Sequence, residues 1–184
     1  MILSTEDPII KKIGKELGLE VPFDRPSDLS NDDTPSLPVM LHVVNMLEKI
    51  ENYLPDIIVL LQPTSPLRKT YHIDDAIDQF LKSDADSLVS VVEVPHSMSP
   101  FSAMELNDSK YLTPYKDLRE DQNIRHKKPK FFARNGALYI TTYKSLMNET
   151  LYGEKIIPYF MSKNVSLDLD DLEDWEIAEF LLEK

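Results

Sequence analysis

Cysteine is absent from this chain of 184 residues, and glycine occurs only four times. Without cysteine the chain has no disulfides, thiolate metal ligands or cysteine nucleophile, which fits a cytoplasmic protein. Its glycines, Gly14, Gly18, Gly136 and Gly153, do not have the spacing of a phosphate-binding loop such as G-x-G-x-x-G or G-x-x-x-x-G-K. A Rossmann or P-loop phosphate site contained within these residues is therefore excluded.

Positive charge is also scarce. The chain has 20 Lys and Arg against 32 Asp and Glu, which gives a formal net charge of −12 at pH 7. A surface of that sign repels phosphate backbones, so a nucleic-acid partner is not expected. A nucleotide remains a candidate ligand, because local basic groups or a metal ion can meet its charge.

Long apolar runs are missing as well. No run approaches the roughly 18 residues of a transmembrane helix, and the opening Met1–Asp7 lacks the basic region of a signal peptide, so no membrane partner is expected. A content of 42% hydrophobic and 28% charged residues is ordinary for a soluble globular protein. The length suits a single domain over residues 1–184.

The order of patterned segments predicts an α/β fold. Helices are expected near 8–17, 37–48, 72–82, 143–150 and 171–183, and strands at 56–62, 87–94, 136–142 and 165–170. Because strands alternate with helices, the sheet is expected to be doubly wound and mostly parallel. Residues 95–132 hold many prolines, aromatic residues and basic residues without clear periodicity, which is typical of a functional segment or an interface arm.

Several of these helices have a clear apolar face. Ile9, Ile10, Ile13 and Leu17 share one side of the first helix, and Met40, Leu41, Val44 and Leu47 share one side of the helix near 37–48. In the last helix we expect Trp175, Ala178 and Leu182 to be buried.

The segment Leu60–Arg68, LLQPTSPLR, directly follows an apolar run that reads as a buried strand. Its two prolines prevent further strand pairing and fix a polar loop. Ligands of open α/β sheets bind beyond the carboxyl ends of the strands, so Gln62, Thr64, Ser65 and Arg68 stand where a substrate is expected. A proline-rich turn without a ligand is the alternative.

Asp168 and Asp170 form the sharpest candidate for a metal site. In a strand, residues i and i+2 point to the same face, and two carboxylates on one face make a hard oxygen site suited to Mg²⁺ or Mn²⁺. The alternative is a solvated acidic tail, because residues 171–184 are acidic too.

Other motifs admit two interpretations each. Asn135 and Gly136 also form a simple turn signal ahead of a strand, and a capped loop before a helix equally explains Ser36. A basic run comprises Arg125, Lys127, Lys128 and Lys130. These residues could form a solvated loop, attract an anionic sugar or take part in a dimer contact. The four histidines lack ligand spacing, and we interpret them as structural or surface residues.

Taken together, LLQPTSPLR, RNGALYI at 134–140 and SLDLDDLED at 166–174 resemble the signature segments of the acylneuraminate cytidylyltransferases. These enzymes join CMP to sialic acid and related nine-carbon sugars. LSTED at 3–7 and NDDTPS at 31–36 fit the same family, so the resemblance covers nearly the whole chain.

The resemblance implies a fold of the nucleotide-diphospho-sugar transferase type. It also implies transfer of CMP from CTP to a sialic-acid-like nonulosonic acid, with release of pyrophosphate. The segment 95–132 corresponds to a dimerisation arm that packs on a second subunit of a homodimer.

Roles for single residues follow from the same resemblance. Asp168 and Asp170 would hold Mg²⁺ or Mn²⁺. On the sugar side lie Gln62, Thr64, Arg134 and Asn135, where Arg134 is suited to hold a carboxylate bidentately. Ser65 and Arg68 would shape the loop, and Arg25 and Ser36 would lie beside the nucleotide.

One family segment has no counterpart in the printed sequence. The family begins with a strand, a loop of the type I-P-A-R-x-G-S-K that wraps the CTP phosphates, and a helix, so the first β-loop-α unit is expected to be missing. Either these residues are part of a longer enzyme, or the chain is a short homologue that binds nucleotide or sugar without catalysis. The residues leave this open, as they do the identity of the sugar.

Overall fold

The structure is a computed structural model that describes residues 1–115 and 129–183. These residues divide into two compact units. Unit 1 comprises 1–59, 84–87 and 140–156, and unit 2 comprises the described parts of 60–83, 88–139 and 157–184. Of the basic run, Arg125, Lys127 and Lys128 lie outside the described residues. The single domain expected over 1–184 stays a prediction.

Unit 1 opens with a short extended segment and a helix. Ile2 forms a parallel bridge with Glu20, and α1 (Pro8–Glu16) lies between them in the chain. Asp7 begins this helix, because its carboxylate accepts hydrogen bonds from the backbone of Ile9 at 2.7 Å and of Ile10 at 2.9 Å.

The longer helix of unit 1 is α2 (Ser36–Glu51), which packs on α4 (Tyr143–Met147). It ends at Asn52, which has a left-handed φ of 51°. Its buried side chains are Met40, Val44 and Leu47, which recur at helical spacing as the sequence pattern predicts.

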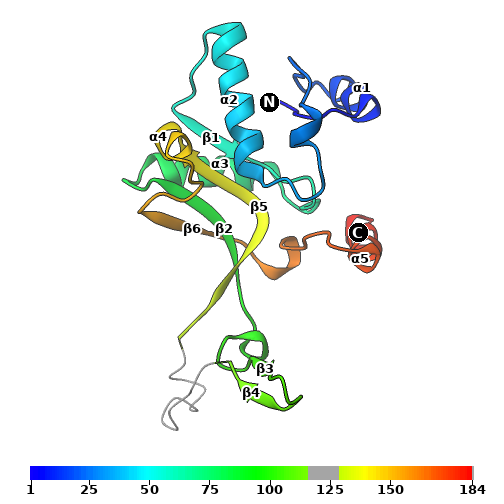
Figure 1. Cartoon of the computed structure of the whole chain (residues 1–184), viewed down its shortest axis with the longest axis vertical. Coiled ribbons are helices and arrows are strands. Elements are labelled where there is room, and N and C mark those ends of the chain that lie inside the picture. The colour runs from blue at the N-terminus through cyan, green and yellow to red at the C-terminus, as the bar shows by residue number, and fades with distance from the viewer. Residues whose placement is uncertain (116–128, 184) are drawn as a thin grey trace. The chain divides into compact units, whose positions relative to one another are not determined.

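Four strands form the main sheet in the order β1 (Ile57–Leu60), β5 (Phe132–Thr142), β2 (Ser87–Glu93) and β6 (Ile156–Phe160) (Figure 1). The end of β5 bonds to the start of β1 through Tyr143 N and Asp56 O. It also bonds to the start of β2 through Thr142 N and Asp86 O, so β5 is antiparallel to both neighbours.

Strands β2 and β6 are parallel. Ser87 N bonds to Lys155 O near their starts, and Met161 N bonds to Val91 O near their ends. Strands β1, β2 and β6 therefore share one direction and β5 opposes them. The expected α/β fold with a mixed, mostly parallel sheet is confirmed.

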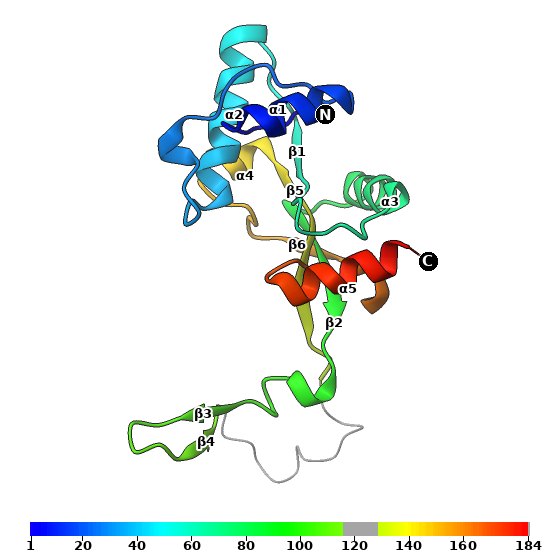
Figure 2. The same cartoon turned by 90° about the vertical axis from the view of Figure 1, so that its right-hand side faces the viewer.

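Unit 2 contains α3 (Thr70–Leu81), α5 (Leu172–Leu182) and a two-stranded hairpin. Gln79 on α3 donates a hydrogen bond to the Pro158 carbonyl of β6 at 2.9 Å. The hairpin pairs β3 (Met104–Leu106) with β4 (Leu112–Pro114) in antiparallel register (Figure 2). Short 3₁₀ turns lie at Ser27–Leu29, His96–Met98 and Lys163–Val165.

Two local predictions are wrong. The segment 165–170 is not a strand: the turn Lys163–Val165 ends there and residues 166–170 are irregular. Ser166 makes hydrogen bonds back into that turn, which compete with strand pairing. Strand β5 begins at Phe132, four residues before the expected start, because the pairing of Val94 N with Phe131 O extends the ladder.

The expected burial of Trp175 and Leu182 on the last helix is also wrong. On α1, Ile9, Ile13 and Leu17 are exposed, and on α5 only Ala178 is buried while Trp175 and Leu182 are exposed. Helical spacing predicts which side chains share a face, but burial requires a second element to cover that face. No described helix combines the length and apolar character that crossing a membrane requires.

Candidate active site

The loop after β1 is held to β5 by an arginine. Arg68 Nη1 donates hydrogen bonds to the carbonyl oxygens of Gln62 at 3.0 Å and Ala137 at 2.6 Å. The side chain is half-buried, and desolvation lowers the pKa of its guanidinium from the ordinary value. Arg68 therefore spans the loop from one end to the other and fixes it on β5.

Ser65, in the middle of the loop, is buried and lies against the same strand. Its hydroxyl donates to the Asn135 carbonyl at 3.4 Å. Gln62 and Thr64 are half-buried in the same loop. The loop thus carries two residues that secure its backbone, Ser65 and Arg68, and two with less buried side chains at the carboxyl end of β1.

Asn135 is buried, with 3% of its surface exposed. Its Oδ1 lies 2.6 Å from the Ser90 hydroxyl, and its Nδ2 donates to the Ser166 hydroxyl at 2.9 Å and to Met161 Sδ at 3.3 Å. The amide is therefore engaged on both sides within the protein. Arg134, the preceding residue of β5, is exposed.

The Asp168 segment lies beside the loop. Leu169 N donates to the Thr64 carbonyl at 2.9 Å, and Gly136 faces Asp168 so closely that an added Cβ would lie 2.5 Å from Asp168 Oδ2. Gly136 has a φ of 71°, a conformation that glycine adopts without strain. The structure thus brings the loop, residues Asn135 and Gly136 of β5, and Asp168 together in unit 2.

Asp168 has a feature that a structural carboxylate rarely shows. Its Oδ1 is buried and has no hydrogen-bond partner among the described residues. Burying an unpaired carboxylate oxygen is costly, and a bound cation removes that cost. Asp170 is exposed, and its backbone N–H donates to Asp174 Oδ2 at 3.0 Å.

These residues fit a divalent cation of the magnesium type. Asp168 offers a buried oxygen without a partner, and Asp170 offers a second carboxylate two residues away. Within 1–115 and 129–183, no group of three or more acidic, histidine or cysteine side chains is placed to hold a metal. Two protein carboxylates suffice for Mg²⁺ when water or phosphate oxygens complete its shell.

The remaining two predicted residues belong to unit 1. Arg25 donates from Nη2 to the Ser4 carbonyl, and its Nε lies 3.9 Å from Glu6 Oε2, so it holds the segment before α1. Ser36 is the first residue of α2, but Pro35 occupies the cap position and no side chain caps this helix. The alternative explanation, that Ser36 caps the helix, is therefore not supported, and its place beside the nucleotide stays a prediction. An open hollow lies beside this helix start, lined by Asp28, Leu29, Asn31, Asp33, Thr34, Pro35 and Pro38.

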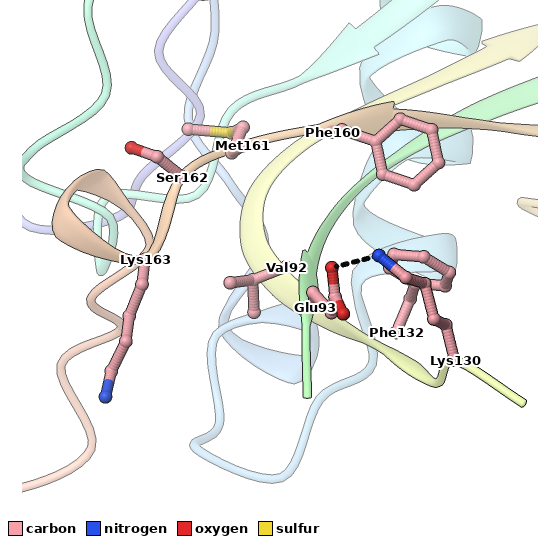
Figure 3. Close-up of a pocket in the computed structure, with 8 residues that line it drawn as sticks. All are labelled: Val92, Glu93, Lys130, Phe132, Phe160, Met161, Ser162 and Lys163. Carbon is pink, nitrogen blue, oxygen red and sulfur yellow. Dashed lines mark hydrogen bonds and ion pairs between the residues drawn. The ribbon is translucent and has the colours of Figure 1, made fainter. Parts of the chain in front are cut away.

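An aromatic pocket in unit 2 was not predicted from the sequence (Figure 3). The rings of Phe132 and Phe160 lie 5.0 Å apart, and Lys130 Nζ forms an ion pair with Glu93 Oε2 at 3.0 Å. Lys163 also lines the pocket. Phe132 was a possible signal, but its partner Phe160 is distant in the sequence.

His72 secures the start of α3, directly after the loop. Its Nδ1 accepts a hydrogen bond from Lys69 N at 3.0 Å, and its own backbone N–H donates to Lys69 O at 3.0 Å. The ring packs edge-on against Tyr159, with centroids 6.3 Å apart. Desolvation is the largest influence on this imidazole and lowers its pKa.

Two solved structures share this fold. One, described as CMP:2-keto-3-deoxy-manno-octonic acid synthetase complexed with CTP, aligns with a TM-score of 0.64 over 98% of this chain and 79% of its own, at 13% identity. The other, 4-diphosphocytidyl-2C-methyl-D-erythritol synthase from Anaerococcus prevotii, aligns with a TM-score of 0.56 over 96% and 76%, at 11% identity. The chain thus shares the α/β fold of these two enzymes.

Proteins related to this chain in sequence have more specific names than these two structures. The chain is 28% identical to CMP-N,N'-diacetyllegionaminic acid synthase of Legionella pneumophila over its whole length and 78% of that protein. It is 27% identical to post-translational flagellin modification protein B of Campylobacter coli, of which it covers 77%. It is 28% identical to N-acylneuraminate cytidylyltransferase of Streptococcus agalactiae, of which it covers 40%.

No family model matches the chain. The relatives nonetheless confirm the resemblance read from the sequence motifs. The chain is a homologue of the N-acylneuraminate cytidylyltransferases and related CMP-nonulosonic acid synthases.

Gly136→Ala is expected to displace Asp168. The new methyl group would strain a backbone with positive φ and contact the carboxylate, so the free energy of unfolding in urea should fall by about 2–4 kcal/mol. Gly18→Ala is the matched control, because Gly18 has a φ of 79° and nothing within 4 Å of an added Cβ. It should cost only about 1 kcal/mol. Equal losses in both variants would contradict the contact with Asp168.

The stability of the protein is expected to fall as pH is lowered below about 6.5, the ordinary histidine pKa. Burial lowers the pKa of His72 in the folded state, so the unfolded chain takes up the proton first and unfolding becomes more favourable. His72→Asn retains an acceptor for Lys69 N and should reduce this slope. Urea unfolding from pH 8 to pH 5 measures it, and an unchanged slope in the variant would exclude His72 as its source.

Proposed function

We propose that this protein is a cytidylyltransferase that transfers CMP from CTP to a nonulosonic acid. The observation that carries the proposal is the buried Asp168 Oδ1, which has no hydrogen-bond partner in the part of the chain that the structure describes and lies in the segment joined to the loop after β1. The names of the relatives, among them N-acylneuraminate, legionaminic acid and pseudaminic acid enzymes, support the same reaction.

In the proposed reaction the anomeric hydroxyl of the sugar attacks the α-phosphorus of CTP in line, and pyrophosphate leaves. Such a transfer depends on positioning and electrostatics more than on covalent help from the protein. Asp168 and Asp170 would hold Mg²⁺ or Mn²⁺, which when bound neutralises charge on the phosphates.

We assign the sugar side to the carboxyl end of β1. Gln62 and Thr64 are the less buried residues of that loop, and the exposed Arg134 on β5 is suited to hold the sugar carboxylate with two parallel hydrogen bonds. Ser65, Arg68 and Asn135 contribute by fixing the backbone that presents these groups.

The resemblance of their segments to the family supports contact of Arg25 and Ser36 with the nucleotide. Arg25 holds the segment before α1, and Ser36 is the first residue of α2. The proposal places the reaction in the cytoplasm, where nucleoside triphosphates are made.

The reaction is tested by pyrophosphate release. The protein is expected to release pyrophosphate when CTP, Mg²⁺ and a nonulosonic acid are all present, with neuraminic, legionaminic and pseudaminic acids compared as acceptors. Asp168→Asn should reduce the rate by about 100-fold or more, because the buried carboxylate is lost. Asp74→Asn, at an exposed position on α3, removes the same charge and should leave the rate unchanged.

Calorimetric titration separates the alternative. Sugar binding without CTP binding and without pyrophosphate release would support a non-catalytic binding homologue instead. If the protein binds neither CTP nor a sugar, both the cytidylyltransferase function and the non-catalytic binding function are overturned.

We also propose that the protein is a homodimer that associates through the hairpin. A two-stranded sheet is marginal alone, and this hairpin exposes a series of large apolar side chains. They are Met104, Leu106, Tyr111, Leu112 and Tyr115, each more than half exposed.

Sedimentation equilibrium is expected to give the mass of a dimer. Leu106→Asp places a charge in the proposed contact. It should raise the dissociation constant of the dimer at least tenfold and so favour the monomer. Ile9→Asp, at an equally exposed position on α1 in unit 1, should not. A monomeric wild type, or dissociation by both variants alike, would contradict dimerisation through the hairpin.

A further inference from the structure

We infer that the hydrogen bond between the side chains of Asn135 and Ser166 positions Asp168 for cation binding. Asn135 and Ser166 are thus positioning residues, not ligands. The inference rests on the proposed function, because it takes Asp168 as a ligand of Mg²⁺ or Mn²⁺.

Asn135 is placed rigidly by its surroundings. Its Oδ1 lies 2.6 Å from the hydroxyl of Ser90, a residue of β2 with no exposed surface, and 3.3 Å from the backbone N–H of Ala137. The Ser90 hydroxyl in turn accepts from Leu138 N at 2.8 Å. Two neighbouring strands therefore fix the amide, and its Nδ2 points at Ser166 in one orientation.

Ser166 connects the fixed Asn135 amide to the irregular segment 166–170. Its hydroxyl accepts from Asn135 Nδ2 at 2.9 Å and donates to the Ser162 carbonyl at 2.8 Å. Residues 166–170 have no strand partner, so their position depends on such single contacts. The next contact along the chain is Leu169 N to the Thr64 carbonyl at 2.9 Å. Asp168 lies between these two contacts.

Strand β5 also contacts Asp168 itself, through Gly136. Gly136, adjacent to Asn135, leaves just enough room for the carboxylate, since an added Cβ would lie 2.5 Å from Oδ2. Asn135 therefore fixes Ser166, two residues before Asp168, by a hydrogen bond. Gly136 contacts the Asp168 carboxylate directly. In this arrangement Oδ1 is buried and has no hydrogen-bond partner within 1–115 and 129–183.

Groups that orient a metal ligand through hydrogen bonds commonly change metal affinity by about 10–100-fold when removed. Ser166 offers a cleaner test than Asn135, because its truncation leaves the buried amide in place. Ser166→Ala removes the hydroxyl, and Ser166→Thr retains it. Ser87→Ala is the matched control, because the buried Ser87 hydroxyl also donates to a backbone carbonyl, that of Tyr152 in unit 1.

Mn²⁺ titration of the full chain, followed by electron paramagnetic resonance, gives the dissociation constant. Ser166→Ala is expected to raise it by about tenfold or more, whereas Ser166→Thr and Ser87→Ala should bind as the wild type does. Amide hydrogen exchange provides a second readout that needs no metal. The Leu169 N–H should exchange faster in Ser166→Ala and as in the wild type in Ser166→Thr.

The outcomes separate this inference from the proposed function. If Ser166→Ala binds Mn²⁺ as tightly as Ser87→Ala while Asp168→Asn abolishes binding, the positioning role is overturned and the cation site stands. If the wild type binds no Mn²⁺, or Asp168→Asn binds it unchanged, the inference and the cation part of the proposed function are both overturned.

Discussion

Three consecutive residues of β5, Asn135, Gly136 and Ala137, carry the contacts on which the candidate site depends. The Ala137 carbonyl accepts a hydrogen bond from Arg68, and the Asn135 side chain donates one to Ser166. Gly136 lies against the Asp168 carboxylate. Gly136 has a positive φ, which glycine adopts without strain, and it has no side chain. Both properties leave room for the Asp168 carboxylate, because an added Cβ would lie 2.5 Å from Oδ2.

The electrostatics of the site follow from this packing. In a chain of net charge −12, a buried carboxylate oxygen without a partner is unfavourable unless a cation is supplied from outside. The guanidinium of Arg68 donates from Nη1 to two carbonyl groups, and no described residue forms a hydrogen bond with Asp168 Oδ1. Backbone and amide hydrogen bonds therefore hold the Asp168 segment in place, and its charge remains available to a ligand.

The sequence motifs named the residues of the candidate site, and their substrate and metal roles stay predictions. The structure adds that the loop after β1 and the Asp168 segment are joined by the hydrogen bond from Leu169 N to the Thr64 carbonyl. The expected strand at 165–170 was wrong, so the shared face of Asp168 and Asp170 does not follow from strand alternation. Arg68 and Asn135 were expected to contact substrate, yet their hydrogen bonds are made within the protein.

Sequence alone determined the α/β class, the helices and strands with strong periodicity, and the relationship to cytidylyltransferases. These properties depend on local spacing and on short motifs, which a single chain displays directly. Only the tertiary structure decided that β5 opposes its neighbours, that Asp168 Oδ1 is buried without a partner, and that the apolar faces of α1 and α5 are exposed. Each of these depends on contacts between residues distant in the chain, and no local pattern records which of those contacts form.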